Sequence, residues 1–273
     1  MDKQTWIRPL TADDRIYFPD EGWQMAASEN APLAFTLGKG EERWGWIAIY
    51  AIPGLTGIYD LDGFVQPDKR RRGVGSQLLH HLAKVMGGGQ ISYAIKEIDS
   101  IAARFFRANN FYVEHEEWMF VHDGTRQHPA AANNRTIRPA AAQTAAVHQF
   151  LQLYDDIFSS YRWYQPYRDF EVEFMLTDIT KMLFLMQAGQ PVGLAWLHLL
   201  FDVGEIEPIG ILPAYQGRGN GRFLLQTAIN HLYDRGAATV KIGVWRENET
   251  AVALYKSVGF HHHKTVTYYA LDL

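Results

Sequence analysis

The stretch "GILPAYQGRGNGRFLL", residues 210–225, joins an apolar run to an amphipathic segment through a loop rich in glycine and arginine. A near-copy, "FVQPDKRRRGVGSQLL", occupies residues 64–79. Backbone N–H groups in the first turn of a helix lack an intrahelical partner, and the helix dipole adds positive charge there. Glycines let an anion approach such a turn closely. Each stretch therefore predicts a helix that begins beside a potential phosphate-binding loop.

The two loops belong to a repeat that covers most of the 273 residues. "WIRPLTADD" at 6–14 matches "TIRPAAAQT" at 136–144 with an offset of 130 residues, and "FFRANNF" at 105–111 matches "LYKSVGF" at 254–260 with an offset of 149. The glycine loops between them are offset by 146 residues. Such a repeat predicts two similar units, with an insertion of about sixteen residues before the second glycine loop.

Each half places apolar, strand-like runs before its glycine loop and a helical pattern after it, which predicts a mixed α/β layer in each half. The polar segment "HDGTRQHPAAANNRT" at 122–136 is typical of a linker. We therefore expect an N-terminal domain at 1–125 and a C-terminal domain at 135–273.

The composition excludes several classes of function. A net charge of −4 argues against a nucleic-acid partner. No apolar run is long enough to cross a membrane, and the N-terminus does not resemble a signal peptide, so we expect a soluble, cytoplasmic protein. The absence of cysteine excludes disulfides, thiolate metal sites and a thioester carried on the enzyme. "HHH" at 261–263 continues into an alternating strand pattern, and we expect no metal site there.

Two families of phosphate loop do not fit the second glycine stretch. A Walker loop ends in Gly-Lys-Ser/Thr, whereas this chain has Gly221-Arg222-Phe223. A dinucleotide fingerprint needs a third glycine where Arg222 stands, and an acidic residue where Lys241 stands.

A third pattern, Gln/Arg-x-x-Gly-x-Gly/Ala, fits both halves. The matching residues are Gln216, Gly219 and Gly221 in one loop and Arg70, Gly73 and Gly75 in the other. Together with "NETAVALYKSVGF" at 248–260, the pattern resembles the GNAT superfamily of N-acetyltransferases. The resemblance covers nearly the whole chain as two domains in tandem, an architecture similar to mycothiol synthase and related tandem GNAT proteins. It implies an α/β fold in which each domain has a mixed, mostly antiparallel sheet flanked by helices.

The resemblance also implies that acetyl-CoA is the co-substrate and that its arm and pyrophosphate lie on the second glycine loop. The residues expected to contact it are Ile209, Gly210, Ile211, Gln216, Gly217, Arg218, Gly219, Asn220, Gly221, Arg222 and Asn248, with Arg70, Arg72, Gly73 and Gly75 as the counterparts in the first half. Asn248 is also the expected N-cap of its helix.

Acetyl transfer to an amine needs a base for the amine and an acid for the departing thiolate. With no cysteine available, direct attack in a ternary complex is the simpler route. The resemblance makes Tyr255 the candidate acid. Glu205 and Glu207 alternate onto one face of a predicted strand and are both candidate bases, and the resemblance favours Glu205. A solvated strand face remains the alternative for these glutamates.

The inserted stretch "YDDIFSSYRWYQPYRDF", residues 154–170, is dense in aromatic residues. In the family's layout it lies on the acceptor side of the cleft, where rings could line a pocket for an apolar, sugar-like or cationic acceptor. The same rings could instead pack against the other domain, and the sequence leaves both readings open.

The first half differs from the family pattern at the positions that correspond to Asn248 and Tyr255. At an offset of 149, Asp99 replaces the asparagine and Phe106 replaces the tyrosine, although Asp60 and Asp62 keep acidic side chains on the preceding strand. We therefore expect a degenerate domain that is structural or binds CoA without turnover.

The sequence as a whole predicts an acetyl-CoA-dependent N-acetyltransferase of a small-molecule amine, with the C-terminal domain catalytic and the protein a monomer or homodimer. A non-catalytic acyl-CoA sensor or scaffold is the main alternative. A tRNA-dependent aminoacyl transferase is more distant, because the chain is acidic and its basic patch is small.

Overall fold

The computed structural model describes residues 5–18, 33–52, 55–95, 100–129, 134–140, 143–161, 164–167, 169–177 and 180–273. The chain forms two compact units. The first comprises Met1–Glu116 and Val266–Leu273, and the second comprises Glu117–Thr265.

Strands and helices alternate along both halves of the chain. The strands are β1 (Thr5–Pro9), β2 (Leu33–Lys39), β3 (Glu42–Ala51), β4 (Ile58–Val65), β5 (Gln90–Ile95), β6 (Tyr112–His122), β7 (Arg135–Ala140), β8 (Thr180–Gln187), β9 (Gln190–Leu200), β10 (Val203–Ile211), β11 (Thr239–Trp245) and β12 (His261–Asp272). The α-helices are α2 (Val74–Met86), α3 (Ile101–Ala108), α4 (Thr144–Phe158), α5 (Asp169–Met175), α6 (Asn220–Asp234) and α7 (Glu249–Ser257). Short 3-10 helices are η1 (Ala12–Tyr17), η2 (Pro67–Lys69) and η3 (Pro213–Tyr215). No helix in the described ranges is long and apolar enough to span a membrane.

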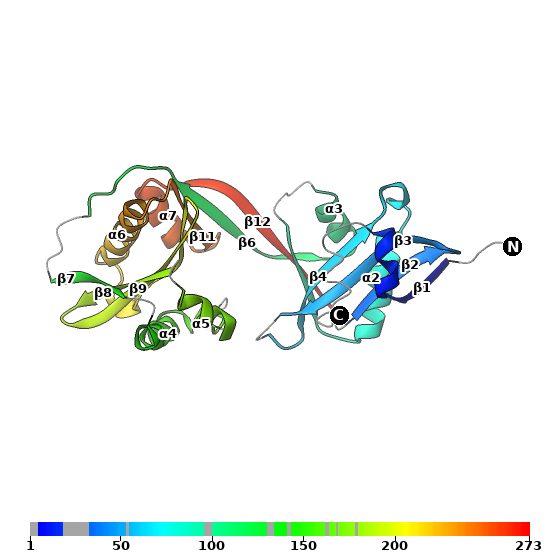
Figure 1. The fold of residues 1–273 in the computed structure, drawn as a ribbon, viewed down its shortest axis with the longest axis horizontal. Helices are drawn as coiled ribbons and strands as arrows, with labels where there is room; N and C mark the ends of the chain where they lie inside the picture. The colour runs from blue at the N-terminus through cyan, green and yellow to red at the C-terminus, as the bar shows by residue number, and fades with distance from the viewer. Residues whose placement is uncertain are drawn as a thin grey trace. The chain divides into compact units, whose positions relative to one another are not determined.

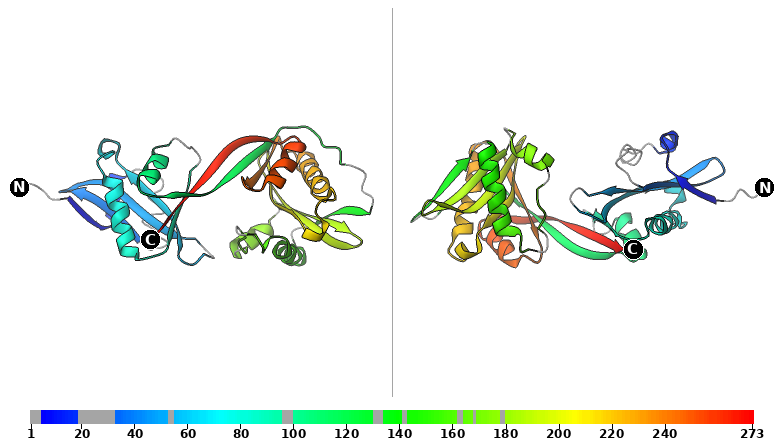
Figure 2. Two further views of the ribbon diagram at one scale, coloured as in Figure 1. Left: turned by 180° about the vertical axis from the view of Figure 1, so that it is seen from behind. Right: turned by 90° about the horizontal axis from the view of Figure 1, so that it is seen from below.

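The first unit is a sheet with the strand order β1-β2-β3-β4-β5-β12, covered on both faces. Its pairs are antiparallel except β4–β5, which is parallel. Ile47 and Ile49 of β3 pack in the core that includes α2, whereas Trp46 and Ala48, which point to the opposite face, pack with Phe18. Figure 2 shows η1 and α2 on opposite sides of this sheet. The sheet therefore contributes to two apolar cores.

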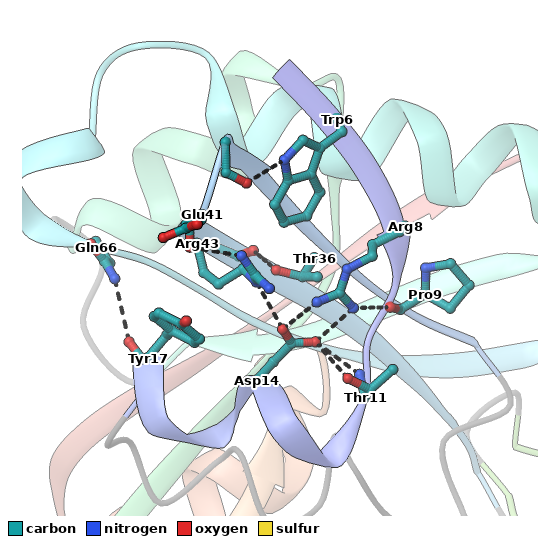
Figure 3. Close-up of polar contacts among 12 residues, drawn as sticks. Trp6, Arg8, Pro9, Thr11, Asp14, Tyr17, Thr36, Glu41, Arg43 and Gln66 are labelled. Carbon is teal, nitrogen blue, oxygen red and sulfur yellow. Dashed lines mark hydrogen bonds and ion pairs between the residues drawn. The ribbon is translucent and has the colours of Figure 1, made fainter. Parts of the chain in front are cut away.

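A buried carboxylate ties η1 to β1 and β3 (Figure 3). Asp14 is fully buried and accepts hydrogen bonds from Nη1 of Arg8 at 2.8 Å and from Nε of Arg43 at 2.9 Å. Burial alone would raise the pKa of Asp14, but the hydrogen bonds from Arg8, Arg43 and Thr11 hold it below its usual value. This network fixes the N-terminal segment to the sheet.

The second unit is a sheet with the strand order β6-β11-β10-β9-β8-β7. β10 and β11 run parallel, and they pair only where Val203–Glu205 meets Thr239–Lys241. Beyond these pairs β10 carries a bulge between Ile206 and Ile209, as its register with β9 shows. Because the ladder between the parallel strands stops early, the two strands separate toward their C-terminal ends. The mixed sheet agrees with the predicted fold class.

Helices cover both faces of the second sheet (Figure 1). Leu232 of α6 packs against Gly204, and residues Ile157 and Phe158 of α4 lie against Gly210. A Cβ at Gly210 would come within 2.8 Å of Ile157, and it would collide with the Phe158 ring more closely still. Gly210 therefore lets α4 approach the strand that leads to the glycine loop.

Each unit contains a strand from the other half of the sequence. Residues 117–122 of β6 pair with β11, inside the second unit. Residues 267–272 of β12 pair with β5, inside the first. The compact units consequently differ from the contiguous domains 1–125 and 135–273 that the sequence predicts, because the last strand of each repeat completes the sheet of the other repeat.

Candidate active site

A pocket of about 340 Å³ opens where β10 and β11 separate. Its lining comes from six elements and one loop of the second unit. The lining residues are Glu117 of β6, Tyr154 and Phe158 of α4, Gln165, Pro166 and Tyr167 of the following loop, Glu171 of α5, Ile206 to Ile209 of β10, Ile242 to Trp245 of β11, and Asn248, Ala251 and Tyr255 at α7.

Glu207 lies in the bulge of β10 and borders this pocket. Its side chain is exposed to solvent, although many protein atoms lie around it. Burial raises the pKa of Glu207 to about 7, and the carboxylates of Glu117, Glu205 and Glu171 add to the shift. A carboxylate with such a pKa can both accept and release a proton near neutral pH.

Tyr255 lines the same pocket from α7 and is only 5% exposed. Burial raises the pKa of its hydroxyl, and the negative charge of Glu207 raises it further. The hydroxyl therefore stays protonated at neutral pH and can only donate its proton to a strong base, such as a thiolate that forms beside it. Tyr255 and Glu207 are thus a donor and an acceptor facing one cavity.

Two predicted cofactor residues also line this pocket. Asn248 caps α7, since its Oδ1 accepts a hydrogen bond of 3.1 Å from the N–H of Ala251. Ile209 follows the bulge on β10. Two further residues on that strand do not line the pocket: Gly210 faces α4, and Ile211 is buried in the core with α6.

Glu205 borders a different pocket, of about 350 Å³. There it lies with His198, its partner on β9, and Lys241, its partner on β11. The structure therefore does not bring Glu205 into one pocket with Tyr255, although the charge of Glu205 still raises the pKa of Glu207. This placement runs against the preference for Glu205 as the base.

The second glycine loop leaves a row of backbone donors free. Gly217 and Gly219 have φ angles of 71° and 75°, and α6 begins at Asn220. Among the described residues, none accepts a hydrogen bond from any backbone N–H between Gly217 and Arg222. Six consecutive unpaired donors at a helix N-terminus suit an anion, so the loop fits the pyrophosphate of CoA.

Side chains hold this loop in shape. Nε2 of Gln216 donates to the carbonyl oxygen of Ile211 at 2.9 Å, and Nδ2 of Asn220 donates to that of Tyr215 at 2.9 Å. Arg218 and Arg222 are both exposed beside the free N–H groups. Gln216 and Asn220 therefore act on loop geometry, whereas the two arginines add positive charge.

The first glycine loop has the same backbone form. Arg71 and Gly73 have φ angles of 61° and 79°, and α2 begins at the next residue. Nε of Arg70 donates to the carbonyl oxygen of Val65 at 2.9 Å, as Gln216 does in the second loop. Arg72 is exposed, whereas Gly75 packs near Phe105. The repeat thus preserves the loop conformation with different side chains.

The chemistry around the first loop differs. Phe106 is buried in an apolar core at the position that corresponds to Tyr255. The two positions correspond because the backbone carbonyl oxygen of each residue accepts a hydrogen bond of 3.1 Å from the N–H of a phenylalanine five residues later. Ser100 caps α3 as Asn248 caps α7, so the counterpart of the asparagine is Ser100 and not Asp99. The one-residue difference arises because α3 is one residue shorter than α7. Asp99 itself lies outside the described residues.

The aromatic insertion contributes to the pocket in part. Tyr154, Phe158 and Tyr167 line it, whereas Tyr161 and Tyr164 do not, and Trp163 lies outside the described residues. Burial raises the pKa of Tyr154 to about 12 and raises that of Tyr167 as well. These rings therefore remain neutral walls of the pocket.

The sequence did not point to Glu117 or Glu171 as site residues. Glu117 lies in the first repeat, and only the pairing of β6 with β11 brings it to the pocket of the second. Glu171 stands one residue beyond the aromatic stretch, in α5. No spacing rule connects either residue to the glycine loop, so nothing in the sequence alone could have identified them.

Comparisons with known proteins identify the family of this chain. The model of the acetyltransferase (GNAT) family matches residues 3–115 and 147–260, which together make up most of the chain. A mycothiol acetyltransferase of Cellulomonas flavigena is 30% identical over 300 aligned residues, covering 93% of this chain and 78% of the relative.

Two solved structures share the fold over nearly the whole chain. A GCN5-related N-acetyltransferase from Sphaerobacter thermophilus has a TM-score of 0.68 at 17% identity, covering 98% of this chain and 95% of that one. A tandem GNAT protein from the clavulanic acid biosynthesis pathway has a TM-score of 0.64 at 13% identity, covering 98% of each chain. With two matches to the family model in one chain, this protein belongs to the GNAT acetyltransferase family, as a tandem N-acetyltransferase that uses acetyl-CoA.

Proposed function

We propose that the second unit transfers the acetyl group of acetyl-CoA to the primary amine of a small molecule, by direct attack within a ternary complex. One observation carries the proposal: Glu207 and Tyr255 line a single pocket at the place where β10 and β11 separate. An acyl-CoA sensor would need only the glycine loop. A proton acceptor and a proton donor in the same cavity favour an enzyme over a sensor.

The two residues have opposite tasks in this reaction. Glu207 accepts a proton from the acceptor ammonium, directly or through water, and so frees the amine to attack. The amine nitrogen forms a bond to the thioester carbon, and the carbon–sulfur bond then breaks. Tyr255 donates its proton to the departing CoA sulfur. The attacking nitrogen loses its second proton to solvent as the amide forms, and Glu207 releases the proton that it accepted. The tyrosine is restored when its phenolate takes a proton from solvent.

The second glycine loop and the strand before it bind and orient acetyl-CoA in this proposal. The free N–H groups from Gly217 to Arg222 suit the pyrophosphate, and Arg218 and Arg222 add charge there. Asn248 and Ile209 line the same pocket, where the proposal places the CoA arm and its thioester. These contacts would hold the thioester beside Glu207 and Tyr255, which favours reaction by proximity.

The first unit binds acetyl-CoA without turnover, or is structural, in this proposal. Its loop has left-handed residues, and its N–H groups have no backbone partner within the described part of the chain, as in an anion site. Its buried Phe106 has no proton to give to a thiolate. The catalytic acid is therefore confined to the second unit.

Release of CoA in the presence of a panel of primary amines tests the proposal. We expect at least one amine to be acetylated, with Tyr255→Phe lowering kcat strongly. Tyr269→Phe is a matched control, since Tyr269 is as buried as Tyr255 and lies in the first unit, outside the pocket. Acetyl-CoA binding without acetylation of any amine would instead support a sensor.

A further inference from the structure

Arg135 contacts the second glycine loop from a strand that is distant in the sequence. It is the first residue of β7, the last strand in the order of the second sheet. Its Nη1 donates to Oδ1 of Asn220 at 3.1 Å and to the carbonyl oxygen of Arg218 at 3.5 Å. A Cβ added at Gly219 would lie 3.8 Å from the same nitrogen. The guanidinium therefore lies beside three consecutive residues of the loop, within the row of free N–H groups.

Two further contacts hold the guanidinium at this place. Its central carbon is 4.8 Å from the ring centroid of Phe223, near the start of α6, a distance at which a ring attracts a cation. Asn220 is only 3% exposed, and its Nδ2 donates to the carbonyl oxygen of Tyr215 while its Oδ1 accepts from Arg135. Because both ends of this amide are bonded, Asn220 keeps one orientation. Arg135 is thus fixed between an aromatic ring and an amide that is itself fixed.

Arg135 has N–H donors that these contacts do not use. A guanidinium has five N–H groups, and both hydrogen bonds of Arg135 start from Nη1. Neither Nε nor Nη2 has a hydrogen-bond partner among the described residues, and Nε is buried. Buried or charged donors without a partner indicate a place for a ligand that supplies acceptors. Together with the unpaired backbone N–H groups of the loop, they suit an anion with several oxygens.

The first glycine loop has different residues at both positions. In the repeat, Thr5 corresponds to Arg135 at the offset of 130 residues, and Val74 corresponds to Asn220 at the offset of 146. Val74 is 2% exposed and has no side-chain acceptor, and threonine has no positive charge. The two loops share a backbone form, but the arginine–asparagine contact belongs only to the half that contains Tyr255.

We propose that Arg135 binds the pyrophosphate of acetyl-CoA and positions the second glycine loop around it. The inference rests on the proposed binding of acetyl-CoA by this loop, and it adds a residue that lies outside the glycine pattern. Arg222 of the loop donates to the carbonyl oxygen of Ser257 at 3.2 Å, whereas Arg135 approaches from another strand. A planar guanidinium can bond Asn220 and a phosphate oxygen at the same time, and a lysine ammonium cannot reproduce this fork.

Calorimetric titration of CoA into the full-length protein tests the proposal without any amine acceptor. Arg135→Met keeps an unbranched side chain beside Phe223 and removes the charge and the donors. We expect it to raise the Kd of CoA by about ten- to a hundredfold, the range for a hydrogen bond to a charged group. Arg135→Lys should give a Kd between that of Arg135→Met and that of the wild type. If the wild type binds two CoA molecules, only one site should weaken, because Arg135 contacts the second loop.

Arg138→Met is the matched control. Arg138 lies on the same strand, and its guanidinium carbon is 4.9 Å from the ring centroid of Phe184. Its side chain donates to Gln149 of α4, on the other face of the sheet from α6. We expect this variant to leave the Kd of CoA unchanged.

Dephospho-CoA separates the two anionic parts of the ligand, because it lacks the 3′-phosphate and keeps the pyrophosphate. Arg135→Met should weaken the binding of dephospho-CoA by the same factor as that of CoA. A loss with CoA alone would overturn the assignment of Arg135 to the pyrophosphate.

The remaining outcomes distinguish the role of Arg135 from the function of the unit. An unchanged Kd in Arg135→Met, or an equal loss in Arg138→Met, would overturn the role of Arg135. Thermal unfolding shows whether each variant is folded; if Arg135→Met is not, Arg135→Lys decides, and a Kd equal to that of the wild type would overturn the proposal. A wild-type protein that binds no CoA would instead overturn the proposed function.

Discussion

The ionisation of Glu207 predicts a specific dependence of the rate on pH. The pKa of this carboxyl is raised to about 7, and only the ionised form can accept a proton from the acceptor. The profile of kcat/KM reports the free enzyme, so its acidic limb should have an apparent pKa near 7. At pH 5, two units lower, about 1% of Glu207 is ionised, and kcat/KM should be about a hundredfold below its plateau.

Glu207→Gln tests this directly, because glutamine keeps the size of the side chain and cannot accept the proton. We expect kcat to fall by about a hundredfold to ten-thousandfold, the usual contribution of a general base. The acidic limb near pH 7 should disappear from what activity remains. The released CoA thiol can be followed with a chromogenic disulfide, and the protein gives no background in this assay because it contains no cysteine.

Glu205→Gln is the informative control, since Glu205 is two residues away on β10 and borders the other pocket. The charge of Glu205 raises the pKa of Glu207, so its removal should shift the acidic limb to lower pH while most of the activity remains. If Glu205→Gln instead abolished activity, and Glu207→Gln kept both the activity and the limb, Glu205 would be the base and the reasoning from the pocket would be refuted.

Three further predictions concern stability, acid catalysis and cofactor binding. Asp14→Asn should lower the free energy of unfolding by about 3 kcal/mol in urea titrations, because it breaks a buried ion pair, whereas exposed Asp13→Asn should change it little. Because folding lowers the pKa of Asp14, its contribution to stability is present above the reference pKa of 3.8 and should be lost as the pH falls through the folded pKa. A wild-type protein that is equally stable at pH 3 and pH 6 would argue against this contribution. Tyr255→Phe should lower kcat about a hundredfold with little change in thermal stability, and an unchanged kcat would remove Tyr255 as the acid. Gly219→Glu should raise the KM for acetyl-CoA at least tenfold, and more than Gly73→Glu does. A side chain at a φ of 75° costs about 1–2 kcal/mol, and the added carboxylate repels the pyrophosphate. Equal effects of the two variants would contradict the assignment of catalysis to the second unit.

Local patterns in the sequence were sufficient to predict the repeat, the mixed fold and the two glycine loops. Gly217 and Gly219 have the positive φ angles that glycine in a tight loop suggests, and Asn248 caps the helix that it was expected to cap. These features depend on residues close together in the chain. Backbone geometry and capping are set locally, so spacing alone can reveal them.

The features that the sequence did not reveal depend on long-range pairing. β6 and β12 each follow the last helix of a repeat, and nothing in their alternating pattern states which sheet they complete. That choice brings Glu117 into the second pocket. The bulge at Glu207 is equally hidden, because an extra residue in β10 shows only against the register of β9. Asp99 was misaligned with Asn248 for a related reason: a helix one residue shorter shifts the offset within a few positions.

The exchange of β6 and β12 determines what happens when the chain is shortened. A fragment that ends in the connection between β6 and β7 would lack the strand that pairs with β5, and the complementary fragment would lack the strand that pairs with β11. Each fragment would present an unpaired strand edge, the kind of surface that recruits foreign strands and promotes aggregation. The two repeats should therefore fold only as parts of one chain. A gene that lost either half would encode an incomplete sheet rather than a smaller enzyme.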